Sequence, residues 1–149
     1  MKLKTIQGIT ILTSLSMFGI SLTKNAIIVN YLGATKPIPA YEYFLMGSTA
    51  IIGGGALEWI IWLANPLCLL SIILLISKQK LSMVTSSIAL ILAISFSFWK
   101  EILGNEGGTM SEIVSFESGY YLWLTSILVL TTGIYLYFHQ VSRQNMLSE

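Results

Sequence analysis

The sequence predicts an all-α fold, a polytopic integral membrane protein built as a bundle of four transmembrane helices. The first observation is composition: 54% of the 149 residues are hydrophobic and only 10% are charged, whereas soluble domains average about 25% charged residues. The second is a mean hydropathy of +0.76. The third is that the charged residues separate long uncharged segments. A soluble domain of this length cannot bury so much apolar side chain, so we expect the chain to lie in a bilayer.

Four uncharged segments are long enough to cross that bilayer. A helix rises about 1.5 Å per residue, so roughly 20 residues span the hydrocarbon layer. Backbone groups must pair within each segment there, which requires helices. The expected helices cover about 5–23, 59–77, 81–99 and 118–138. Two longer connections remain, about 24–58 and 100–117, and we expect both to be loops of a single membrane domain, 1–149.

The first expected helix is the least apolar of the four. Two lysines precede it, as in a signal peptide, but Ser21 and Thr23 are a poor match to the small-residue pattern of a cleavage site. We therefore expect a helix that is retained.

The positions of lysine and arginine predict the orientation. Cytoplasmic loops carry more of these residues than outer loops do. With both chain ends in the cytoplasm (N-in, C-in), the inner side holds five of the eight basic residues: Lys2, Lys4, Lys78, Lys80 and Arg143. The outer side holds the other three: Lys24, Lys36 and Lys100. Both long connections then lie outside a cell membrane, which the short inner loops and the composition suggest is a bacterial cytoplasmic membrane.

The uncharged segment 43–57 allows three interpretations. It contains Gly47 and the run 53–55 of three glycines, and each glycine weakens a helix by about 1 kcal/mol. The segment lies at the outer interface, dips into the membrane as a re-entrant loop, or forms an early part of the second helix that is broken at the glycines.

Glu58 is the one charged residue between Glu42 and Lys78. Acids at membrane depth are costly and mark functional sites by default. A second helix that begins near Ala56 would instead place Glu58 in its first turn, where a carboxylate favours the helix dipole. We retain Glu58 as a candidate functional residue on either interpretation.

Aromatic residues open two of the expected helices. Trp59 and Trp62 open the second, and Trp123 opens the fourth. Tryptophan favours the headgroup boundary, which explains these positions as an interface belt. The alternative is an aromatic pocket for a lipid or another ligand.

Asn65 and Pro66 interrupt the second helix. A proline removes one backbone donor and leaves the carbonyl four residues earlier, that of Trp62, without its partner. The Asn65 amide is available to that carbonyl, and a kinked helix with an amide inside the bundle either packs against its neighbours or lines a cavity.

Catalytic, metal and cofactor sites are not expected. The chain has one cysteine, one histidine and no phosphate-binding glycine motif. The net charge of +1 excludes a basic surface for nucleic acid. We find no pairing of nucleophile and base, so the catalytic and metal sets are empty and no cofactor is implied.

We therefore expect a non-enzymatic membrane protein that acts by binding, as an accessory or protective subunit for another membrane protein. Its partners would be the lipid bilayer and either another membrane protein or a second copy. The alternative is a small oligomeric transporter or channel for a cation or small solute, with Glu58 and Asn65 facing the solute. A third hypothesis, an intramembrane enzyme acting on lipid, lacks a visible nucleophile. An enclosed polar cavity beside Asn65 would favour transport, and a dry, tightly packed bundle would favour binding.

Overall fold

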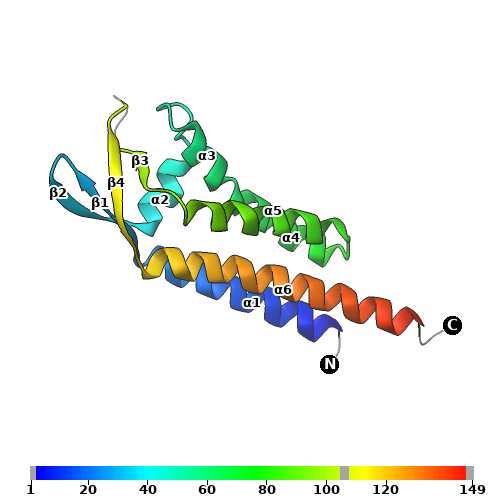
Figure 1. Ribbon diagram of the computed structural model, residues 1–149. Helices are drawn as coiled ribbons and strands as arrows, with labels where there is room; N and C mark the ends of the chain where they lie inside the picture. Colours follow the sequence, from blue (N-terminus) through cyan, green and yellow to red (C-terminus); the bar gives the residue numbers. More distant parts are fainter. Residues whose placement is uncertain (1–2, 105–107, 147–149) are drawn as a thin grey trace.

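The computed structural model describes residues 3–104 and 108–146 and has a mixed α/β architecture (Figure 1). The prediction of an all-α, four-transmembrane-helix bundle is wrong. The two connections expected to be loops, 24–58 and 100–117, contain strands that pair with one another in a four-stranded antiparallel sheet. Local sequence pattern did not predict this pairing, because it joins segments more than 70 residues apart.

Three segments are long and apolar enough to cross a membrane, judged by length and composition. They are α1 (Leu3–Leu22), the segment Ala56–Ile76, and α6 (Ser118–Met146). The second consists of α3 (Ala56–Trp62) and α4 (Ala64–Ile76), which meet at Leu63. The fourth apolar helix, α5 (Leu81–Phe96), has 16 residues and is shorter.

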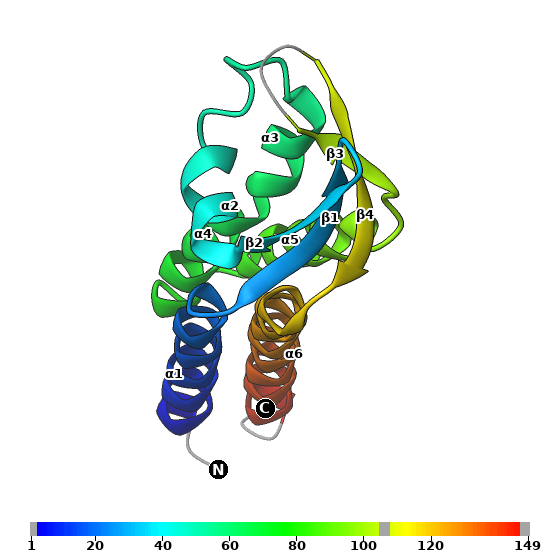
Figure 2. The ribbon, with the colours of Figure 1, turned by 90° about the vertical axis from the view of Figure 1, so that its left-hand side faces the viewer.

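The helices form two packed pairs. α1 and α6 lie side by side along their length, and α4 and α5 form a hairpin that packs on them mainly through α5 and α6 (Figures 1 and 2). The start of α1 and the end of α6 lie at one end of the molecule, and the sheet with α2 (Ala40–Gly47) and α3 lies at the other. We call the latter the sheet end. Lys2, which entered the sequence-based orientation, lies outside the described residues.

Small and hydroxylated residues allow α1 and α6 to approach closely. Gly133 of α6 faces the Thr10 side chain so tightly that an added Cβ atom would overlap it. Ser14 donates a hydrogen bond to the carbonyl of Ser126 at 2.9 Å. Close approach and hydroxyl bonds of this kind are how helices associate in lipid, where both neighbours are equally apolar.

The sheet has the order β2-β1-β4-β3. β1 (Asn25–Tyr31) and β2 (Ala34–Pro39) form a hairpin, and β3 (Glu101–Leu103) pairs with β4 (Met110–Phe116). The hairpin turn is Leu32-Gly33, and both residues have positive φ, 50° and 84°, as the two-residue turns that suit strand twist require. Pairing of β1 with β4 joins the two hairpins, with Ile27 opposite Phe116.

Both edges of this sheet are blocked within the described residues. β2 forms one edge and carries Pro37 and Lys36, residue types that discourage further strand pairing. β3 forms the other edge, where the backbone N–H of Leu103 donates to the Glu58 carboxylate at 2.9 Å. The sheet is therefore not built to accept an additional strand from a partner.

Residues 43–57 are neither one loop nor one helix. α2 ends at Gly47, turns occupy the residues from Ser48 to Gly54, and α3 begins at Ala56. α2 is anchored to the end of α1 closest to the sheet by the rings of Phe18 and Phe44, whose centroids are 5.6 Å apart in an edge-to-face arrangement. The glycine run thus forms the turn between two helices at the sheet end.

Candidate functional site

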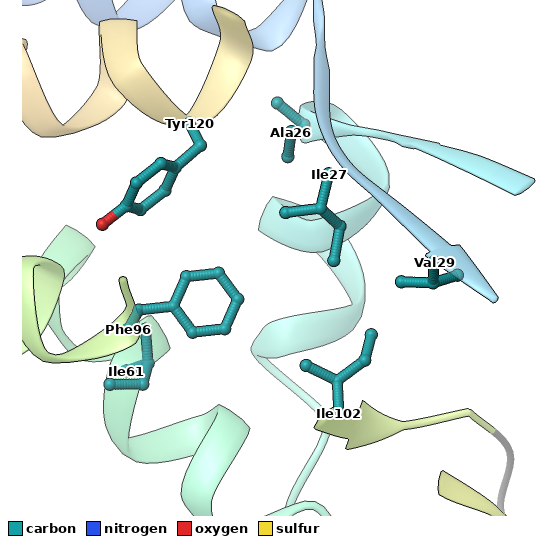
Figure 3. Packing of buried hydrophobic residues seen from close by; sticks show 8 residues of the cluster. Ala26, Ile27, Val29, Ile61, Phe96, Ile102 and Tyr120 are labelled. Atoms are coloured by element: carbon teal, nitrogen blue, oxygen red, sulfur yellow. The ribbon is translucent and has the colours of Figure 1, made fainter. Parts of the chain in front are cut away.

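A cavity of about 1030 Å³ lies at the sheet end, between the sheet, α2, α3 and the adjacent ends of α5 and α6. Figure 3 shows the hydrophobic core beside the cavity, where Ile27, Phe96 and Ile102 point toward one another from β1, α5 and β3. Phe96 and Ile102 also line the cavity. Ligand sites usually have volumes of about 300–1,000 Å³, apolar walls and a few placed polar groups. This cavity is at the upper end of that range.

An aromatic cluster centred on Phe96 forms one side of the site. The Phe96 ring lies 5.8 Å from Tyr120, 5.6 Å from Phe116 and 6.2 Å from Tyr43, centroid to centroid. The Tyr120 hydroxyl points away from the sheet and donates to the carbonyl of Ala93 at 3.0 Å (Figure 3). Because these rings come from α2, α5, β4 and α6, the cluster joins the sheet to the helices.

Glu58 lines this cavity from the first turn of α3. Its side chain is half-buried, and its Oε1 atom accepts the hydrogen bond from Leu103. In the described part of the chain, the second oxygen, Oε2, takes part in no hydrogen bond. The carboxylate therefore favours the helix dipole and closes the sheet edge, while one oxygen keeps free capacity to accept hydrogen bonds.

Tyr43, from α2, lines the same cavity. Its hydroxyl oxygen is shielded from solvent and has no hydrogen-bond partner among the described residues. Burial, and to a smaller extent the negative charge of Glu58, raises the pKa of Tyr43 well above its ordinary value. The phenol consequently stays protonated near neutral pH.

Asn65 joins two of the tryptophans by hydrogen bonds. Its amide nitrogen donates to the carbonyl of Trp62 at 3.0 Å, the carbonyl that Pro66 leaves without a backbone donor. Its amide oxygen accepts from the indole of Trp123 at 2.9 Å. The indole of Trp62 donates in turn to the carbonyl of Phe44 at 2.8 Å, which holds α2 against α3.

The structure brings together four of the five residues singled out from the sequence. Glu58, Asn65, Trp62 and Trp123 all line the cavity, whereas Trp59 is half-buried and is not part of its lining. Sequence reasoning missed Tyr43 as a site residue. The only signal for Tyr43 was that an aromatic residue stands beside Glu42 at the start of an uncharged stretch. Such a residue indicates the membrane–water interface as much as it indicates a binding site.

The side chains around the cavity include an acid and an amide. Among residues 3–104 and 108–146, no group of three or more histidine, cysteine, aspartate or glutamate side chains is placed to hold a metal ion. The polar side chains that line the cavity include the carboxylate of Glu58 and the amide of Asn65, which is already engaged on both sides. Comparison with models of known protein families, with curated proteins and with solved structures finds no match to this chain.

Proposed function

We propose that this chain is a multi-pass protein of a cell membrane that acts by binding, in an accessory or protective role beside another membrane protein, and that the cavity is its binding site. The three apolar helical segments support membrane insertion. Four described basic residues lie at the end opposite the sheet, which supports a cytoplasmic position for that end and an outer position for the sheet. They are Lys4, Lys78, Lys80 and Arg143. A bacterial cytoplasmic membrane is the setting that we propose.

The observation that carries the binding function is the cavity itself. It is large enough for a molecule of lipid or drug size, and its walls are mainly apolar and aromatic. The cavity is partly open, and its lining includes exposed apolar residues such as Met46 and Ile52 as well as core residues. An apolar or amphiphilic small molecule that entered it would cover apolar surface that otherwise faces solvent.

A transporter or channel is the second candidate, and the cavity beside Asn65 is what favours it. On the side of the cavity away from the sheet, however, the side chains of Ala64, Ala89 and Ala93 are fully buried against one another and against Ile127. Ser71 and Thr85 satisfy each other across α4 and α5 at 2.7 Å. A closed, dry helical core beneath an apolar cavity supports binding over passage of a hydrophilic solute.

The outward face of α1 supports a partner helix. Gly8 and Gly19 are exposed, and a Cβ atom added to either would meet open space. Exposed hydroxyl residues, including Thr13 and Ser16, share the helix. Small and hydroxylated residues permit close packing of a transmembrane helix of another membrane protein, which would give the accessory role a physical basis.

Retention of a neutral amphiphile tests the binding function. Full-length protein in nanodiscs would be equilibrated with 1-dodecanol, released in the mass spectrometer and examined for bound probe. We expect one retained probe per chain, lost in Val29→Phe, because Val29 is buried, lines the cavity and a ring there would fill it. Ile91→Phe is the control, since Ile91 is exposed on α5. Equal retention by the wild type and Val29→Phe would contradict the proposal.

Site-specific photo-crosslinking in cells tests the accessory role. A crosslinker at Ser16 should give a product that maps to a transmembrane helix of one other membrane protein, and Gly8→Leu with Gly19→Leu should remove it. A product with a second copy of this chain would replace the accessory role by self-association. Crosslinks to lipid alone would overturn both.

A further inference from the structure

Glu58 places a carboxylate in the lining of the cavity. Its Oε1 atom accepts the Leu103 hydrogen bond, and among the described residues its Oε2 atom takes part in no hydrogen bond. Tyr43 also lines the cavity, but its hydroxyl oxygen is closed off from solvent, so a ligand meets the Tyr43 ring and not that oxygen. The Glu58 carboxylate is therefore a polar group available to the head of a ligand.

The charge balance around the cavity is negative. Among the residues that the structure describes, three charged ones line it: Lys36, Glu42 and Glu58. Lys36 is exposed on the edge strand β2, so water screens its charge. Glu42 on α2 and Glu58 on α3 are both half-buried, so water screens their charges less. A carboxylate beside an apolar cavity is stabilised by a cation that shares its low-dielectric surroundings.

We propose that the cavity binds an amphiphile with a primary ammonium head, with the head at the Glu58 carboxylate and the hydrocarbon chain against Phe96 and Ile61. This inference rests on the proposed function of the cavity as a binding site and names the class of ligand.

An ammonium head matches the Glu58 carboxylate better than an alcohol or an anionic head does. It carries a positive charge, three donors and no acceptor, so it forms a charge-assisted hydrogen bond to the carboxylate. An alcohol can donate to the same oxygen but brings no charge. A carboxylate or phosphate head would lie beside the Glu58 charge and be repelled. The rings of Trp62 and Tyr43 in the same wall add cation–π attraction.

The chain of the amphiphile has an apolar path away from the head. Ile61 and Phe96 are almost fully buried and line the cavity from α3 and α5, and Val29 and Ile102 line it from the sheet. Such surfaces bind a hydrocarbon chain at roughly 25 cal/mol per Å² of apolar area removed from water. Phe18 and Leu22, near the end of α1 closest to the sheet, also line the cavity. The cavity therefore adjoins the level of the bilayer boundary, where amphiphiles are concentrated.

The test compares probes that share one chain and differ in the head. Dodecylamine, 1-dodecanol and dodecanoate would be titrated into nanodiscs that contain the full chain, with protein-free nanodiscs subtracted. We expect dodecylamine to bind about tenfold more tightly than 1-dodecanol, the effect of about 1.4 kcal/mol for one favourable charge pair, and dodecanoate to bind most weakly. Lysophosphatidylethanolamine separates the sources of an ammonium head: tight binding points to a lipid headgroup, and weak binding points to a simple amine.

Glu58→Gln isolates the charge. Glutamine retains an oxygen that accepts the Leu103 hydrogen bond, so the sheet edge stays closed while the negative charge disappears. The variant should bind dodecylamine no better than 1-dodecanol. Glu112→Gln is the matched control, because it removes the same charge from an exposed position on β4 outside the cavity lining, and it should keep the tenfold preference.

The outcomes separate the two proposals. If no probe binds above the protein-free level, the cavity is not a binding site and the proposed function fails. If dodecylamine and 1-dodecanol bind equally to the wild type, the binding site stands and the ammonium class is wrong. Tightest binding of dodecanoate overturns the inference outright. This comparison uses the wild type alone, so it decides the question even if Glu58→Gln does not fold.

Discussion

The carboxylate of Glu58 accepts a hydrogen bond from the backbone N–H of Leu103 at 2.9 Å, and the first turn of α3 thereby closes the sheet at β3. An edge strand whose donor is taken by a side chain of the same molecule cannot offer it to another chain. Glu58 also lines the cavity, so the bond holds its carboxylate group in place there. Structural and binding roles therefore converge on one residue.

The first prediction separates those roles by stability. Glu58→Ala removes the acceptor and should lower the free energy of unfolding by about 2 kcal/mol, the usual size for a hydrogen bond to a charged group. Glu58→Gln should lose less than half of that, because the neutral bond survives. Equilibrium unfolding in mixed micelles measures both. If alanine and glutamine have equal effects, the Leu103 bond does not stabilise the sheet edge.

Asn65 and Pro66 give a second prediction, based on coupling. Asn65→Leu leaves the carbonyl of Trp62 and the indole of Trp123 unpaired and should destabilise the protein by about 1–3 kcal/mol. Pro66→Ala supplies the missing backbone N–H to Trp62. The double variant should therefore be more stable than the sum of the single effects predicts, by about 1 kcal/mol in a double-mutant cycle. Simple additivity would show that Asn65 does not substitute for the absent donor.

The helical part of the fold follows from local patterns. Uncharged segments of suitable length are helical in the structure, and the carbonyl that Pro66 leaves free is bonded by Asn65, as local backbone chemistry suggested. These inferences depend on neighbours within four residues of one another. Helix ends were less predictable: α6 continues to Met146, beyond the uncharged stretch that ends at Phe138.

The sheet and the cavity depend on long-range pairing. The β-branched run Ile27, Ile28 and Val29 and the pair Ile113 and Val114 are strand-forming residues, but hydropathy alone placed them in loops. Only the pairing of β1 with β4 brings the two regions together. Tyr43 could not be selected from sequence for the same reason, since its cavity is formed by the sheet and by residues of six helices, from α1 to α6.

The third prediction concerns the contact of α1 with α6. Gly133→Val would place its side chain against Thr10 and force the helices apart, so we expect a loss of several kcal/mol, as for overpacked cores. Gly8→Ala is the matched control, because its added Cβ meets open space and alanine favours a helix by about 1 kcal/mol over glycine. Thermal unfolding should rank Gly8→Ala at or above the wild type. A tolerated Gly133→Val would mean that the two helices are not packed at this point.

The hairpin turn of β1 and β2 provides a fourth prediction, in which one variant should stabilise the protein. Leu32 has φ 50°, a conformation that costs most side chains about 1 kcal/mol and suits asparagine. Leu32→Asn should raise the free energy of unfolding by about that amount, and Leu32 is 82% exposed, so little packing is lost. Gly33→Ala, at φ 84°, should lower it by a similar amount. The reverse order would rule out this turn.

Tyr43 provides a fifth prediction, in alkaline solution. Burial, followed by the charge of Glu58, raises the pKa of Tyr43 in the folded protein above the ordinary value of 10.0. Below pH 10 the phenol is protonated in both the folded and the unfolded chain, so stability does not depend on it. As the pH rises above 10, the unfolded chain releases this proton while the folded chain retains it, and stability falls by up to about 1.4 kcal/mol per pH unit.

Unfolding of the wild type and of Tyr43→Phe, compared at pH 8 and pH 11, measures the difference. Since the two proteins share every other tyrosine, the gap between them isolates Tyr43. At pH 8 the variant should be as stable as the wild type or more so, because it removes a buried hydroxyl that has no partner in the described chain. At pH 11 it should be the more stable of the two, and a parallel decline of both proteins would show that the Tyr43 hydroxyl is open to water.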